Sequence, residues 1–281
     1  DPSFTYGNRK LIGYADGPSK PIFNLNNFVT ETIKTGTIYD STIFERFFYN
    51  CNTGEDEEDI IKFVRGYDVW NEDGPFGTKG PGNMRKSLLG DTFHSNLVYV
   101  GPPSDSISSS NERSEAYFRF NNNYRYFKTM YENREGRIYV GANDGMLHAF
   151  DKDLNLRWSF IPPPILSKLR SLKGADPSGT TNGTSNSKFL VDGPILVKDI
   201  YSPAMGRPDR GNWKTVLIGS LGYGGKGYYA LDISDPRNPI FMGAVENDDK
   251  NNRVLHWNRG GEMQVSKYGT GSEAMDTSHN K

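Results

Sequence analysis

Asp91, His94 and Ser95 are the residues of this 281-residue sequence whose types come nearest to a hydrolytic triad. A triad requires a particular geometry and an oxyanion hole, which neighbouring residues in a sequence do not supply, and no G-x-S-x-G nucleophile elbow is present. We therefore interpret His94 as a structural histidine that Asp91 or Ser95 binds inside a turn. His148 lies in an apolar, strand-like run, and we expect it to be packed and not catalytic.

The spacing of one group of glycines suggests a second possible chemistry, nucleotide binding. The run Gly222–Gly227 has the G-x-G-x-x-G spacing and follows an apolar strand. A phosphate-binding turn of this kind has to open a helix, whereas Tyr228–Ile233 reads as another strand. Lys226 is followed by Gly and not by Ser or Thr, so an ATPase-type phosphate loop is absent as well. The run is interpreted as a glycine-rich hairpin.

Metal binding is the third chemistry. Asp151, Asp153 and Asn155 place side-chain oxygens at alternate positions, as in a calcium loop, but the Gly and the Glu of that loop are missing. The four His form no H-x-H or H-x-x-x-H pair. We interpret Asp151–Asn155 as a turn and keep its three oxygen-bearing side chains as the candidate metal site. No other cofactor site is identified in this chain.

The elements that must position these residues are short strands. Apolar runs at 97–100, 137–141, 146–150 and 156–160 are separated by turn residues, and the Asn-Asp-Gly of 143–145 favours a tight hairpin. The pattern returns at 215–219, 227–232 and 240–243, where Ala-Leu-Asp of 230–232 matches Ala-Phe-Asp of 149–151. Repeated meanders of this kind are typical of propeller blades.

We therefore predict an all-β chain that forms an incomplete β-propeller with quinoprotein-like (PQQ-like) blades, about three of which fall within residues 61–281. Loops are predicted to be inserted at 102–115 and 171–188. Residues 1–60 are unassigned and are expected to precede the propeller or to pack on it. The acidic start and closing Gly of 53–66 predict one short helix.

Composition excludes several classes of protein. The 33 basic and 34 acidic side chains balance, so we expect no nucleic-acid partner. No apolar run is long enough for a membrane span, so membrane insertion is not expected. Cys51 is the single cysteine and can form no internal disulfide. The chain begins Asp-Pro without a leader, and we interpret it as a mature or excised piece.

Several motifs in order resemble the PilC/PilY family of type IV pilus biogenesis and tip proteins. The most specific is the run 137–151, RIYVGANDGMLHAFD. Upstream, Val64–Gly66 and LLGDTFHS at 88–95 resemble the family's entry into its propeller. Downstream, the resemblance continues in WSFIPP at 158–163, VDGP at 191–194, and WKTVLIG at 213–219 with 222–232 and Asp235-Pro236.

The resemblance implies a C-terminal propeller of a large exported protein. It implies a non-catalytic role in pilus assembly, retraction control and surface adhesion, at the pilus tip or outer membrane. Its implied partners are major and minor pilins, together with a host-surface glycan or protein, or a phage. The family's calcium loop lies downstream of the segment that matches 230–232, so calcium is assigned to the full-length protein and to no residue here. The signature residues are interpreted as turn and blade-packing residues: Asp91, His94, Asn143, Asp144, Gly145, His148, Asp151, Asp192 and Asp232.

Two other functions stay open. Quinoprotein oxidoreductases are propellers with similar Gly-Asp-Gly turns and with Trp-bearing strands, as at Trp158 and Trp213, although many use a vicinal disulfide that a lone Cys cannot form. A carbohydrate-binding adhesin propeller would suit the aromatic-rich loops, since 13% of the residues are Phe, Trp or Tyr.

Overall fold

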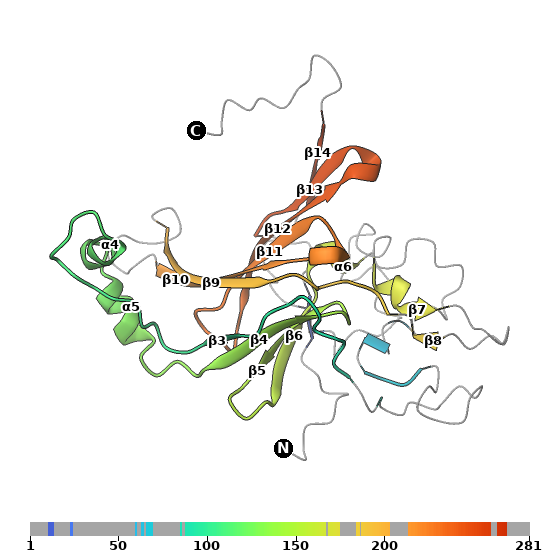
Figure 1. Cartoon of the computed structure of the whole chain (residues 1–281), viewed down its shortest axis with the longest axis horizontal. Helices are drawn as coiled ribbons and strands as arrows, with labels where there is room; N and C mark the ends of the chain where they lie inside the picture. Colours follow the sequence, from blue (N-terminus) through green and yellow to red (C-terminus); the bar gives the residue numbers. More distant parts are fainter. Residues whose placement is uncertain are drawn as a thin grey trace.

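The computed structural model describes most of the chain from residue 88 onward (Figure 1). The described residues are 88–166, 168–174, 187–202, 213–259 and 263–268, together with 11–13, 23–24, 60, 63–64, 66–69, 85 and 184–185. They form mainly antiparallel β-sheets with a few short helices. No helix among them is both long and apolar enough to cross a membrane.

The first sheet is an antiparallel meander. Its strands are β3 (Val98–Val100), β4 (Arg137–Ala142), β5 (Met146–Phe150) and β6 (Leu156–Phe160), each hydrogen-bonded to the next. Strand β1 (Leu11–Gly13) pairs in parallel with β6, and β2 (Phe23–Asn24) pairs with β1. The first sheet therefore has six strands in the order β2-β1-β6-β5-β4-β3.

The second sheet is an unbroken meander of six strands. They are β9 (Ile195–Tyr201), β10 (Trp213–Ser220), β11 (Gly227–Asp232), β12 (Ile240–Asp248), β13 (Arg253–Trp257) and β14 (Met263–Lys267). All neighbours are antiparallel. The β13–β14 hairpin projects from the rest of the sheet (Figure 1).

The two sheets repeat one local design. In the first, the β5–β6 register shifts between Ala149 and Phe150; in the second, the β11–β12 register shifts between Ala230 and Leu231. Both shifts fall in the matched segments 149–151 and 230–232 of the sequence repeat. A β-bulge at such a shift increases the local twist of the strands. The sequence predicted an incomplete propeller of about three blades, and the described residues form two large sheets that do not close into a ring.

The sheets pack on each other through large side chains. The ring of Phe160 lies 5.7 Å from that of Tyr229 and 5.9 Å from that of Phe241, measured between centroids. Trp158 is buried in the same core, and its indole N–H donates to the Pro236 carbonyl at 2.9 Å. The hydrophobic contact and the hydrogen bond together hold β6 against the second sheet.

Two helices that the sequence analysis did not predict follow the expected loop at 102–115. They are α4 (Glu115–Asn121), capped by the Ser114 hydroxyl, and α5 (Tyr124–Met130). Both lie beside the beginning of β10 (Figure 1), where Tyr124 and Phe127 form a small core with Trp213. Burial and the bond to Asp199 raise the pKa of Tyr124, so its hydroxyl stays a donor.

The remaining elements are short. Residues 60, 63 and 64 are helical and buried, and Gly66, with a φ of 101°, ends the helical turn. These residues agree with the end of the helix predicted at 53–66. Residues 53–59, 61, 62 and 65 lie outside the described part. Of the predicted loop 171–188, the structure describes the paired strands β7 (Lys173–Gly174) and β8 (Thr184–Ser185) but not residues 175–183 and 186. The short elements are α6 (Pro163–Leu166), β7 (Lys173–Gly174), β8 (Thr184–Ser185), and the 3₁₀ turns Leu169–Leu172, Gly222–Gly224 and Asp249–Asn251.

Candidate functional site

A polar network joins the two sheets at the β4–β5 turn. The Asn143 amide donates to Asp91 Oδ2 at 2.7 Å and to Asp192 Oδ1 at 3.2 Å. Its oxygen accepts the backbone N–H of Leu190 at 3.0 Å. Two distant segments, one at Asp91 and one at residues 190–192, therefore meet on the buried Asn143 side chain, and every polar atom of its amide group has a partner.

His94 is held at the surface end of this network. Its Nδ1 lies 2.6 Å from Asp192 Oδ2, and Asp192 is buried while 39% of the His94 side chain is exposed. A carboxylate that receives Nδ1–H fixes both the tautomer and the orientation of the ring. The sequence analysis assigned the partner of His94 to Asp91 or Ser95; the structure instead provides Asp192, 98 residues away.

Asp91 and Ser95 face other partners. The Ser95 hydroxyl accepts the backbone N–H of Gly141 at 2.9 Å, and Asp91 binds Asn143 through both its side chain and its carbonyl. The three residues that suggested a triad therefore serve three separate contacts. Asp91 and Ser95 attach the segment 90–96 to the first sheet, and His94 attaches it to Asp192, just before the second sheet.

A second Asp–His–Ser set lies in the core of the first sheet. His148 Nε2 is 2.9 Å from Asp144 Oδ2, and its Nδ1 is 2.8 Å from the Ser159 hydroxyl. His148 and Ser159 are fully buried. Asp144 also accepts the backbone N–H groups of Met146 and Gly90, both at 3.2 Å. Because the serine hydroxyl is not exposed, the set can position strands but cannot present a nucleophile to a substrate.

Gly145 completes the turn that carries this network. Its φ is 91°, in the left-handed region that glycine adopts without steric cost. A Cβ there would lie 3.0 Å from Leu169 Cδ2 and 3.2 Å from Ile165 Cγ2. Both the backbone conformation and the packing therefore require glycine at position 145 of the Asn-Asp-Gly turn.

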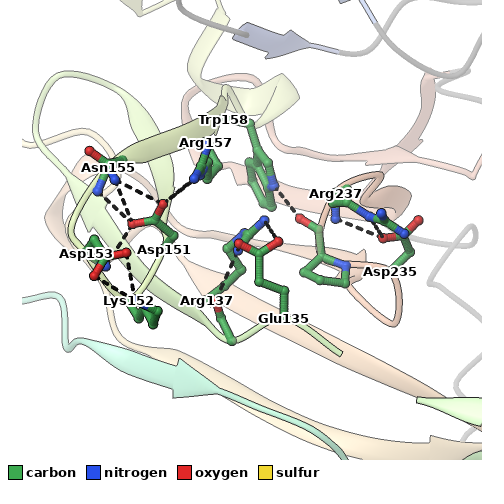
Figure 2. A network of polar contacts seen from close by, with 12 residues as sticks. Glu135, Arg137, Asp151, Lys152, Asp153, Asn155, Arg157, Trp158, Asp235 and Arg237 are labelled. Atoms are coloured by element: carbon green, nitrogen blue, oxygen red, sulfur yellow. Dashed lines mark hydrogen bonds and ion pairs between the residues drawn. The ribbon is translucent and has the colours of Figure 1, made fainter. Parts of the chain in front are cut away.

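The candidate metal residues form a closed turn (Figure 2). Asp151 Oδ1 accepts the backbone N–H groups of Asp153 and Asn155, both at 2.9 Å, and its Oδ2 accepts Arg157 Nε at 2.8 Å. Asp153 contacts Lys152 at 2.8 Å. Burial acts to raise the pKa of Asp151, but these bonds and those from the Asn155 amide outweigh it and lower the pKa to about 2.

That donor set does not fit a calcium ion. Calcium takes about six to eight oxygen ligands, whereas Asp151 is surrounded by N–H groups and a guanidinium. Across the described ranges, no group of three or more His, Cys, Asp and Glu is placed to hold a metal. Asp232, the counterpart in the second sheet, likewise accepts the N–H and hydroxyl of Ser234 and pairs with Lys214.

An exposed aromatic cluster, which the sequence analysis missed, surrounds His94. We define it as Phe93, His94, Phe189 and Tyr223. The His94 ring lies 4.4, 5.0 and 5.9 Å from the rings of Phe93, Tyr223 and Phe189 respectively, and the last two are 5.6 Å apart. No local signal in the sequence could have found it, because its members come from three separate loops.

The fold and the site define a class of protein: repeated, bulged antiparallel meanders that are joined to each other by the buried Asn143 and Asp192 and by the partly exposed His94. Residues 89–271 match the family described as the PilY1 beta-propeller domain. The chain therefore belongs to the PilY1 β-propeller family.

Similar proteins with known names support the same family assignment. The chain is 37% identical over 183 residues to the type IV pilus biogenesis factor PilY1 of Pseudomonas aeruginosa strain PAK, covering 64% of this chain and 14% of the relative. It is 35% identical over 161 residues to a PilY1 homolog of Xylella fastidiosa, covering 56% of this chain and 12% of the relative. The chain thus spans about an eighth of the length of these relatives. The solved C-terminal domain of P. aeruginosa PilY1 is 28% identical, with a TM-score of 0.34, over 54% of this chain and 34% of that one.

Proposed function

We propose that this chain is a non-catalytic part of a type IV pilus tip and biogenesis component, acting in pilus assembly, retraction control and surface adhesion. Its partners would be major and minor pilins, and it would be extracellular, at the pilus tip or on the outer membrane. The observation that carries the proposal is the family match over 89–271, with relatives named as type IV pilus biogenesis factors.

The non-catalytic part of the proposal rests on how the polar residues are used. His148 and Ser159 are buried, and Asp192 is fully buried beneath His94. Asp151 is occupied by a turn and by Arg157. Groups that could act as base, nucleophile or ligand instead join strands and loops, which is the use expected of a scaffold.

We further propose that the two sheets are blades of an incomplete propeller. One face of the second sheet packs on the first through Tyr229 and Phe241. The opposite face exposes Leu196, which pairs across the strands with Ile218, and Tyr228. A third antiparallel sheet would cover this apolar row as the first sheet covers the other face, continuing the same packing.

Filament co-purification tests the proposed function. Filaments would be sheared from the native host and from a matched strain without its major pilin, and the chain's peptides in each sheared fraction would be quantified by mass spectrometry. We expect the peptides with the filaments of the first strain and their loss from the sheared fraction of the second. Equal recovery from both strains would contradict the pilus assignment.

A further inference from the structure

The aromatic cluster is an exposed surface built by three loops. Phe93 is 71% exposed, Tyr223 76% and Phe189 48%, and each ring still contacts His94 or another member. Exposed aromatic rings gathered from separate loops mark contact sites more often than single exposed rings do. Neither the strand packing nor the buried polar network requires Phe93 or Tyr223 to be aromatic.

The cluster is held rigidly from below. His94 is fixed by the buried Asp192, and the residue after Phe189 donates its N–H to Asn143. Tyr223 stands between Gly222, which has a φ of 55°, and Gly224, where a Cβ would collide with the Leu190 carbonyl. A surface whose backbone is fixed in advance loses little conformational entropy when a ligand binds.

The size of the cluster favours a small ligand over a protein. An aromatic side chain presents about 200 Å² when fully exposed, so the four rings at their observed exposures offer roughly 450 Å². A stable protein interface needs about 800 Å² from each partner. The cluster alone is therefore too small for a protein partner and large enough for one or two sugar rings.

The polar atoms of the cluster match hydroxyl groups. Within the described part of the chain, neither His94 Nε2 nor the Tyr223 hydroxyl has a hydrogen-bond partner. With Nδ1 engaged by Asp192, Nε2 is the ring nitrogen left to share a hydrogen bond with a hydroxyl group, and the tyrosine hydroxyl is both donor and acceptor. A pyranose presents an apolar C–H face, which is attracted to the negative face of an aromatic ring, beside hydroxyls that suit both atoms.

We propose that Phe93, His94, Phe189 and Tyr223 form a carbohydrate-binding site, on which a pyranose ring stacks while His94 and Tyr223 bind its hydroxyls. The proposal deepens the adhesion part of the proposed function and rests on it for its biological setting. It does not depend on the filament experiment, since binding is measured on the purified chain.

The test is a glycan array probed with the purified 281-residue chain, followed by titration of the best-bound oligosaccharide. Tyr223→Ala and Phe93→Ala should each weaken binding about tenfold, the loss of one stacked ring. Tyr223→Phe keeps the ring and should weaken it less. Tyr126→Ala is the matched control, since Tyr126 is 51% exposed on α5 and its ring contacts no member of the cluster among the described residues. Circular dichroism and thermal melting would show that each variant is folded.

Saturable binding that Tyr223→Ala and Phe93→Ala weaken, and Tyr126→Ala leaves unchanged, would support the site. Binding to no glycan on the array would overturn it, as would glycan binding that the cluster variants leave intact. A cluster variant that instead loses capture of pilin while glycan binding is absent would identify a protein contact and overturn the carbohydrate proposal. None of these outcomes alters the filament result, so the two proposals fail separately.

Discussion

Replacing Asp192 by Asn would test whether the polar network fastens the two sheets. The carboxylate accepts His94 Nδ1 at 2.6 Å and the Asn143 amide at 3.2 Å. An amide of the same shape keeps one acceptor oxygen but turns an NH₂ toward one of these donors. A hydrogen bond to a charged group contributes about 1.5–3 kcal/mol, and a buried donor left unpaired costs a similar amount. We expect Asp192→Asn to lower the free energy of unfolding by about 2–3 kcal/mol.

Urea unfolding followed by circular dichroism measures this change. With a slope near 3 kcal/mol per M, the upper end of the range for small proteins, the midpoint would fall by about 1 M. Asp153→Asn is the control, since the Asp153 side chain is 63% exposed and pairs with the exposed Lys152; a surface change of this kind stays within about 0.5 kcal/mol. A double-mutant cycle with His94→Ala should give a coupling of about 1–3 kcal/mol. If Asp192→Asn were no more destabilising than Asp153→Asn, the network would not hold the sheets together.

Three further changes have effects that can be worked from single contacts. Trp158→Phe keeps most of the ring but leaves the Pro236 carbonyl without its donor, and should cost about 1–3 kcal/mol in urea unfolding; a change below 0.5 kcal/mol would show that this bond is dispensable. Gly145→Ala forces a φ of 91° on a residue with a Cβ and crowds Leu169, and should lower the melting temperature, whereas an unchanged value would mean that the turn relaxes freely. The folded-state pKa of Asp151, about 2, lies below the ordinary value near 3.9, so its stabilisation is present above about pH 4 and is lost as the pH falls toward 2. Melting temperatures measured from pH 5 to pH 2 should therefore fall less in Asp151→Asn than in the unaltered chain, and parallel curves would contradict this assignment.

The central strands could be predicted because each is an apolar run between turn residues. The predicted runs at 137–141, 146–150 and 156–160 coincide with β4, β5 and β6 to within a residue. The predicted runs at 215–219, 227–232 and 240–243 lie within β10, β11 and β12. In both sheets these strands lie between neighbouring strands and carry buried side chains, which explains why their sequences are apolar.

The missed elements are those whose residues are determined by distant contacts. In strand β9, Lys198 and Asp199 interrupt the apolar residues, and the β13–β14 hairpin mixes apolar with polar residues and is largely half-exposed, so neither gives a long apolar run. Helices α4 and α5 are rich in aromatic residues, which have only moderate helix propensity, and they are stabilised by packing on Trp213. Tertiary contacts there outweigh local preference.

For the candidate site, the residue types were predictable and the pairings were not. The signature residues Asp91, His94, Asn143 and Asp192 were named from the sequence, and the structure brings all four together. The partner of His94 lies 98 residues away, and Tyr223 reaches the same ring from the glycine-rich hairpin. Such pairings follow from how the two sheets face each other, which a single sequence does not encode locally.

Immunogold electron microscopy of piliated cells tests the central claim most directly. An antibody against the purified chain would be applied to the native host and to a matched strain without its major pilin, and the positions of gold particles scored along filaments and cell surfaces. The proposal predicts particles at filament ends in the first strain. Uniform labelling of the cell body, equal in the two strains, would contradict a role at the pilus tip.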